Sequence, residues 1–330
     1  MTSPVPGRPS VVYLAVTERC PAACLHCEIW RHGAQARDAP TETWLRWLDR
    51  LGEFCAPATV HFVGGEPMQR PDLQRLVERA VLRGMTAGLC TSGWGVTHER
   101  ARALAAAGLS IAYVSLDGSE AATVDATRGR AGSFEKAMQA IEAFGAQPGV
   151  VVVLSSLLHA GNAAQFPALL ALARRIGARI MMQTLNQTLG AAPDAAWWLR
   201  STLWPKNGEQ IALVETALDA LLAARTEAGL VLNTVEQLEG ARLFYRDPAG
   251  VPALSCPAGS SECGVDAVGD VRLCFYREPI GSLEDPASVE SVWQGGAARA
   301  RRAEVASCRA ACRLNTSNID ALVTKGRAAP

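Results

Sequence analysis

Short apolar runs alternate with stretches of helical periodicity from residue 11 to residue 184. The apolar runs predict strands near 11–16, 58–63, 86–91, 110–116, 149–156 and 178–184. The periodic stretches between them predict helices near 41–54, 71–84, 97–107, 133–146 and 162–177. Repeated β/α units of this kind build a parallel sheet, either closed into a barrel or open, with functional loops at the C-terminal ends of the strands.

The rhythm breaks at 186–210, where glycine and proline surround Trp197, Trp198 and Trp204. This segment is expected to be an insertion at the rim of the sheet, followed by a long amphipathic helix over 211–228. The three tryptophans could wall a substrate pocket, or they could pack the end of the barrel closed. Gln183 and Asn186, at the end of the sixth strand, are candidate substrate contacts.

Composition limits the class of protein. The chain has 330 residues and 49% hydrophobic content, enough for one large core with a small appended domain. Lys plus Arg equals Asp plus Glu, 32 each, so charge does not favour nucleic acid or an anionic membrane as a partner. The polar N-terminus lacks an apolar signal segment, and a cytoplasmic location is expected. Ten cysteines in a reducing compartment indicate metal or redox chemistry before disulfides.

Three of these cysteines, Cys20, Cys24 and Cys27, form a Cys-x3-Cys-x2-Cys loop directly after the first predicted strand. Three thiolates without a fourth ligand suit a 4Fe-4S cube with one open iron, which can bind a small chelating molecule. The alternative is a structural zinc site with His26 as the fourth ligand, although His26 lies between two of the cysteines and would crowd a tetrahedral shell.

Further motifs follow later strands in order: Gly64-Gly65-Glu66-Pro67, Thr91-Ser92-Gly93, and Ser115-Leu116-Asp117-Gly118 with Thr127-Arg128-Gly129. With the cysteine loop, they resemble the radical S-adenosylmethionine (radical SAM) enzymes, and His26 stands where that family usually has an aromatic residue. The resemblance implies a partial six-stranded (β/α)6 TIM-like barrel. It also implies that a reduced 4Fe-4S cluster cleaves S-adenosylmethionine to a 5'-deoxyadenosyl radical, which abstracts a hydrogen atom from the substrate.

The resemblance also implies the residues that contact S-adenosylmethionine. Glu66, on the glycine turn, would contact the methionyl amino group, and Arg128 would offer a planar fork to its carboxylate. Each residue has an ordinary alternative as a turn former, a helix cap or a solvated arginine. The candidate contacts are His26, Gly64, Gly65, Glu66, Pro67, Ser92, Ser115, Asp117, Arg128 and Asn162.

A second cysteine group lies in the last eighty residues of the chain. Cys256-x12-Gly269-x4-Cys274 resembles the start of SPASM and twitch auxiliary-cluster domains, with a β-hairpin over 264–271. Cys308 and Cys312, spaced x3 where x2 is frequent, would complete four thiolates around a second 4Fe-4S cluster of the single-cluster twitch form. A four-cysteine zinc site is the alternative.

Three cysteines fall outside these groups. Cys263 could donate a hydrogen atom to a substrate radical as a catalytic thiol, or it could be a spare cluster ligand. Cys55 and Cys90 lie in apolar surroundings and are expected to be inert core residues.

The predicted organisation is a radical SAM barrel over 1–230 and a twitch-like iron-sulfur domain over 231–330. Because about ten residues precede the first strand, we expect dehydrogenation or epimerisation of a small polar metabolite such as a sugar or aminocyclitol. The alternatives are a maturase that modifies a ribosomal peptide or protein, and an iron-sulfur protein without catalysis. An electron donor such as flavodoxin or ferredoxin is an expected partner.

Overall fold

The computed structural model describes residues 7–188, 194, 196–248, 256–308 and 310–314. Six strands pair in parallel, each with the next in the chain. They are β1 (Val11–Thr17), β2 (Thr59–Gly64), β3 (Thr86–Thr91), β4 (Leu109–Ser115), β5 (Val151–Leu157) and β6 (Arg179–Gln183). Each lies within two residues of its predicted bounds, because a strand buried on both faces is a continuous apolar run in the sequence.

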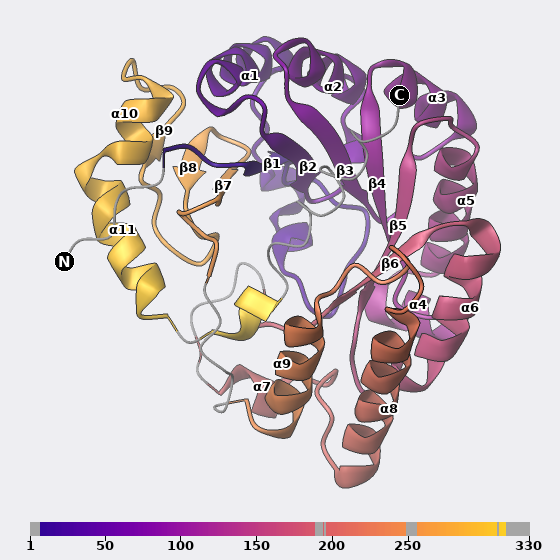
Figure 1. Cartoon of the computed structure of the whole chain (residues 1–330). Helices are drawn as coiled ribbons and strands as arrows, with labels where there is room; N and C mark the ends of the chain where they lie inside the picture. Colours follow the sequence, from indigo (N-terminus) through magenta and orange to yellow (C-terminus); the bar gives the residue numbers. More distant parts are fainter. Residues whose placement is uncertain (1–6, 189–193, 195, 249–255, 309, 315–330) are drawn as a thin grey trace.

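Helices cover the outer face of this sheet (Figure 1). They are α1 (Thr41–Cys55), α2 (Leu73–Leu82), α3 (His98–Ala106), α4 (Ala121–Arg128), α5 (Ser133–Gly145) and α6 (Phe166–Ile176), with the short 3-10 helices η1 (Ile29–Gln35), η2 (Pro67–Gln69) and η3 (Ala163–Gln165). In α1, Trp44, Leu48 and Leu51 recur at helical spacing and are buried. Helix α4 was not predicted from the sequence, and it matters for the site because it ends at Arg128.

The C-terminal hairpin extends the same sheet. Strand β7 (Glu262–Val265) pairs in parallel with β1, and β8 (Asp270–Arg272) and β9 (Gly281–Ser282) follow antiparallel. The resulting nine-stranded order is β6-β5-β4-β3-β2-β1-β7-β8-β9, so β6 and β9 form the two edges. A partial, open barrel and a hairpin near 264–271 are therefore confirmed. Gly269, at φ +92°, makes the hairpin turn against the Trp47 ring, where a Cβ would lie 2.5 Å from a ring carbon.

Side chains alternate between the two faces of each barrel strand. In β1, Val12 and Leu14 belong to the main core, which the outer helices cover. Tyr13 lies on the opposite face, where it packs with a smaller cluster inside the barrel. That inner cluster consists of Ile111, Tyr113, Val153 and Met181. The inside of the barrel is thus lined by a distinct set of residues that alternation along the strands selects.

After β6 the chain forms α7 (Trp197–Arg200), α8 (Gly208–Ala224) and α9 (Val235–Arg246), and after the hairpin α10 (Val289–Gln294), α11 (Gly296–Ala306) and η4 (Ala311–Leu314). Helix α8 corresponds to the helix predicted over 211–228, whereas α9 was not predicted. One core cluster contains residues from both the barrel and the tail. A domain boundary at 230/231 stays a prediction. In the described ranges, no helix has the length and apolar content needed to cross a membrane.

Candidate functional site

The cysteine loop lies between β1 and η1, at the C-terminal end of the first barrel strand. Cys20, Cys24 and Cys27 are all partly exposed and none is in a disulfide. Burial raises the pKa of Cys20 to about 12, and the neighbouring thiols of Cys24 and Cys27 add to that shift. The fold therefore brings the three thiols into one electrostatically coupled group, as the spacing predicts.

Helix α4 holds this loop in place. The backbone N–H of Ala23 donates to the Arg128 carbonyl, and that of Leu25 donates to the Thr127 carbonyl, each at 3.0 Å. Gly129 ends α4 at φ +62°, and a Cβ there would lie 2.2 Å from the Ala23 carbonyl oxygen. The Thr-Arg-Gly motif thus packs against the cysteine loop, and its glycine is required by that close approach.

The glycine pair after β2 makes a close approach to protein backbone. A Cβ on Gly64, at φ +133°, would lie 2.3 Å from the Thr17 carbonyl oxygen, and one on Gly65 would lie 2.2 Å from that of Arg19. The Gly65 and Glu66 N–H groups donate to these same two oxygens at 2.7 and 2.8 Å. These glycines let the β2 loop bind the start of the cysteine loop. Their predicted contact with S-adenosylmethionine stays untested.

Glu66 is 1% exposed, and each of its two carboxylate oxygens accepts two hydrogen bonds. Oε1 accepts from the Thr91 hydroxyl at 2.7 Å and the Met68 N–H at 3.1 Å. Oε2 accepts from the Ser92 N–H at 2.7 Å and the Ser92 hydroxyl at 2.5 Å. Burial raises the pKa of Glu66, while these four donors oppose the rise. Glu66 ties the β2 and β3 loops together, so contact with a ligand would require it to exchange one of these bonds.

Arg128 and Asp117 form a buried ion pair at the ends of α4 and β4. Arg128 Nε lies 2.6 Å from Asp117 Oδ2, with side chains 11% and 0% exposed. The guanidinium also hydrogen-bonds to the Cys24 thiol, and it holds the pKa of Asp117 below its usual value despite burial. Asn162, fully buried, donates through Nδ2 to the Asp117 and Leu157 carbonyls. Asp117 and Asn162 therefore shape the loops, whereas Arg128 connects them to the cysteines.

Cavities lie among the described residues beside the two cysteine groups. The first, here called the loop cavity, has a volume of about 260 Å³ and is lined by His26, Ser115 and Arg128, with Gln183, Asn186 and Tyr276 facing them. It brings together three of the predicted cofactor contacts and both predicted substrate contacts. Glu66, Ser92, Asp117 and Asn162 are instead occupied with hydrogen bonds between loops.

The four tail cysteines also gather. Burial raises the pKa of Cys312 to about 12, and Cys274, Cys256 and Cys308 add to the rise. The hairpin positions Cys274, and the segment after α11 supplies Cys308 and Cys312. Within the described ranges, no three His, Cys, Asp or Glu side chains are placed to hold one metal ion. A 4Fe-4S cube has a different requirement, since each of its thiolates binds a separate iron.

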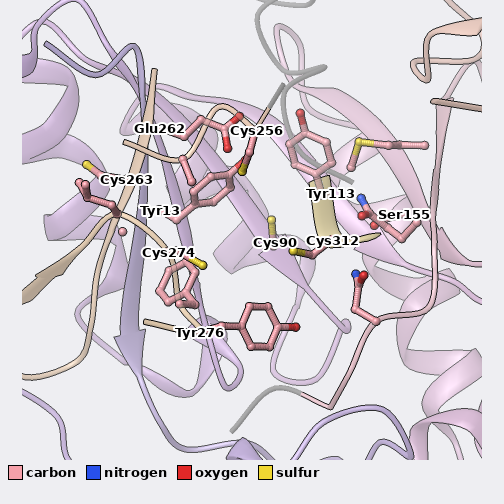
Figure 2. A pocket seen from close by; sticks show the side chains of 17 residues that line it. Tyr13, Cys90, Tyr113, Ser155, Cys256, Glu262, Cys263, Cys274, Tyr276 and Cys312 are labelled. Atoms are coloured by element: carbon pink, nitrogen blue, oxygen red, sulfur yellow. The ribbon is translucent and has the colours of Figure 1, made fainter. Parts of the chain in front are cut away.

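The other two cavities adjoin these cysteines. The inner cavity, about 360 Å³, is lined by Tyr13, Cys90, Tyr113 and Glu262 together with Cys256, Cys274 and Cys312, as Figure 2 shows. The rim cavity, about 440 Å³, is lined by Trp197, Trp198, Cys274, Cys308 and Cys312. Trp204 is buried and packs on Phe244 and Tyr245 at 5.0 and 5.1 Å. Trp197 and Trp198 thus line a cavity, whereas Trp204 packs in the core, so both roles expected for the tryptophans occur.

The role of Cys263 as a thiol that donates a hydrogen atom stays a prediction, because this residue lines the inner cavity and is also packed in the main core. It is opposite Val12 in the β1–β7 ladder and shares the main core with it. Its side chain lies on the other side of β7 from Glu262 (Figure 2). Burial raises the pKa of Cys263 well above its ordinary value, and the neighbouring Cys55 and Glu262 add to the rise. Conversely Cys90, expected to be core, lines the inner cavity, while Cys55 is buried as expected.

Tyr276 is a site residue that the sequence analysis did not identify. Together with Asn186, it lines all three cavities. Its hydroxyl donates to the Gln187 carbonyl at 3.0 Å. Burial raises its pKa, and the thiols of Cys312 and Cys274 from the tail and of Cys27 from the cysteine loop add to the shift. Tyr276 therefore stands between the two cysteine groups.

Residues 14–173 match the model of the radical SAM superfamily. The PqqA peptide cyclases of Ruegeria pomeroyi and Rhodopseudomonas palustris are 30% and 34% identical, over 90% and 88% of this chain and 76% and 75% of theirs. The chain belongs to the radical SAM superfamily. Its cofactors are accordingly a 4Fe-4S cluster and S-adenosylmethionine.

Other relatives of this radical SAM chain agree. The mycofactocin maturase MftC of Mycobacterium tuberculosis is 29% identical over 89% of this chain and 75% of its own length. Among solved structures, Streptococcus suis SuiB bound to S-adenosylmethionine superposes with a TM-score of 0.69, at 15% identity over 92% of this chain and 69% of that one. The similarity to SuiB concerns the fold alone.

These relatives correct one prediction. Dehydrogenation or epimerisation of a sugar or aminocyclitol is wrong as the main interpretation, since the relatives across most of the chain are named peptide cyclase and maturase. That expectation rests on the short segment before the first strand, and the length of this segment does not decide the class of substrate.

Proposed function

We propose that this radical SAM enzyme is a maturase that modifies a ribosomally made peptide. The observation that carries the proposal is the similarity, over about nine-tenths of the chain, to enzymes named PqqA peptide cyclase and mycofactocin maturase. Two cavities that share Asn186, Cys274, Tyr276 and Cys312 in their linings offer space for more than one residue of a peptide.

The thiols of Cys20, Cys24 and Cys27 would hold the first cluster. Their mutual proximity fits a cluster bound by three thiolates, and Arg128 beside Cys24 offsets the negative charge that the thiolates acquire on losing their protons. S-adenosylmethionine would lie in the loop cavity against His26, Ser115 and Arg128. Cys256, Cys274, Cys308 and Cys312 would hold a second 4Fe-4S cluster, because four coupled thiols match its ligand set.

When bound, these groups supply reductive cleavage of S-adenosylmethionine and abstraction of a hydrogen atom from the peptide. The chain's own residues orient the reactants. Arg128, fixed by Asp117, presents a cation to the loop cavity, where it suits a carboxylate. Tyr276, whose hydroxyl donates to the Gln187 carbonyl, would lie between that cavity and the tail cysteines. An electron donor such as flavodoxin or ferredoxin would supply the reducing equivalent.

The test is anaerobic reconstitution followed by incubation with S-adenosylmethionine, a chemical reductant and short peptides encoded beside the gene. We expect one of these peptides to change mass, with about one 5'-deoxyadenosine formed per modified peptide. A Cys20→Ala variant is the control and should form neither product. If 5'-deoxyadenosine formed while every tested peptide kept its mass, the proposal of a peptide maturase would be refuted.

A further inference from the structure

The inside of the barrel contains buried polar atoms that the proposed mechanism does not use. Tyr113 is 2% exposed and, by strand alternation, points to the inside of the barrel with Ile111. In the part of the chain that the structure describes, its hydroxyl has no hydrogen-bond partner. A buried hydroxyl without a partner is disfavoured, so such a group calls for a ligand or a specific role.

His61 strengthens this observation. It is fully buried, its ring lies edge-on to Tyr113 with centroids 5.5 Å apart, and it stacks on Tyr13 at 5.6 Å. Both of its ring nitrogens also lack a partner among the described residues. Burial lowers the pKa of His61 to about 3, so the ring is neutral at physiological pH. A neutral imidazole without hydrogen-bond partners thus packs against Tyr13 and Tyr113, the two tyrosines that line the inner cavity.

The walls of the inner cavity indicate what could fill it. Tyr13, Met181 and Phe275 supply apolar surface, and Glu262 contributes a carboxyl group that accepts hydrogen bonds. The volume is about 360 Å³, and Cys256, Cys274 and Cys312 line the same cavity, so a bound second cluster would share this space with a group packed against Tyr13 and Tyr113. Through Asn186 and Tyr276 the inner cavity adjoins the loop cavity, so a group inserted there stays beside the S-adenosylmethionine site.

We propose that the inner cavity binds one side chain of the peptide substrate, and that the Tyr113 hydroxyl hydrogen-bonds to the polar end of this side chain. The ligand class is a side chain with an apolar body and a neutral or cationic hydrogen-bonding end, since Glu262 disfavours a carboxylate. This assignment rests on the proposed function, because the peptide substrate supplies the side chain. The binding site itself is tested without any peptide.

Phenol and benzene are suitable probes, because they share an apolar body and differ in one hydroxyl. Their dissociation constants are measured by ligand-observed NMR on the reconstituted protein, with Tyr113→Phe as the variant. We expect the wild type to bind phenol about fivefold to tenfold more tightly than benzene, and Tyr113→Phe to lose most of this preference. Tyr245→Phe is the matched control, since the Tyr245 hydroxyl bonds to the Leu158 carbonyl and the Leu185 N–H in the core.

The midpoint of thermal unfolding gives a second readout that distinguishes the two variants. Tyr113→Phe should leave the midpoint unchanged or raise it, because it removes a hydroxyl that has no partner in the free protein. Tyr245→Phe should lower the midpoint. A phenol preference that is equal in the wild type and both variants, or no binding of either probe, would overturn the proposal. If the probes behave as expected and no peptide is modified, the side-chain site stands and the maturase function fails.

Discussion

Replacing Glu66 with glutamine should loosen the junction between the β2 and β3 loops. Both carboxylate oxygens of Glu66 accept a backbone N–H, from Met68 on one side and Ser92 on the other. Glutamine replaces one oxygen by an NH₂ group. Whichever way the amide is turned, an NH₂ then faces one of these backbone N–H groups, and a buried donor loses its acceptor.

The expected cost follows from the kind of bond lost. A hydrogen bond to a charged group contributes about 1.5–3 kcal/mol, and a buried donor left without an acceptor costs about 1–3 kcal/mol. We therefore expect Glu66→Gln to destabilise this junction by about 2–4 kcal/mol. Since about 1.4 kcal/mol corresponds to a tenfold change, the amides of Met68 and Ser92 should exchange roughly 10- to 1,000-fold faster.

Hydrogen–deuterium exchange of fragments covering Glu66–Gln69 and Thr91–Gly93 is the assay. Glu42→Gln is the control, because Glu42 is 71% exposed and its ion pair with Arg75 lies on the surface, where it contributes at most about 1 kcal/mol. Exchange in Glu66→Gln that matches the wild type in both fragments would refute the description of Glu66 as a tie between the two loops.

Three further predictions concern the ion pair, the barrel floor and the cavity junction. Asp117→Asn leaves Arg128 buried without its counter-ion, so we expect it to lower the free energy of unfolding, measured in urea, by about 3–5 kcal/mol. Adding Arg128→Met should restore part of this loss. An unchanged urea midpoint in Asp117→Asn would contradict the prediction. Because His61 stays neutral when folded and takes up a proton on unfolding, its contribution should fall by about 2 kcal/mol from pH 8 to pH 5, and His61→Phe should show a weaker pH dependence than the wild type. Tyr276→Ala should release several 5'-deoxyadenosine molecules per modified peptide, whereas Tyr276→Phe should stay near one; a ratio near one in both would remove Tyr276 as a positioning residue.

The barrel could be predicted from the sequence because its strands are buried on both faces and appear as apolar runs. The cysteine loop could be predicted because its three ligands lie within eight residues. The role of the glycine pair could not be, since a glycine that approaches a ligand and one that approaches another loop have the same sequence. Only the fold shows that Gly64 and Gly65 contact Thr17 and Arg19.

The tail was harder for a different reason. Which face Cys263 occupies depends on the register of β7 against β1, strands separated by about 250 residues, and one step of register exchanges the two faces. Tyr276 follows Cys274 in a segment without periodicity, so the local sequence does not mark it. Tyr113 could have been found, because alternation along the predicted fourth strand places it on the same face as Ser115.

We propose that this radical SAM enzyme takes a hydrogen atom from a peptide bound between its two cysteine groups. The most direct measurement is a single turnover with a deuterated form of the peptide that changes mass, followed by mass spectrometry of 5'-deoxyadenosine. We expect deuterium in 5'-deoxyadenosine from the wild type and from Tyr245→Phe. Unlabelled 5'-deoxyadenosine alongside modified peptide, with every peptide carbon deuterated, would contradict it.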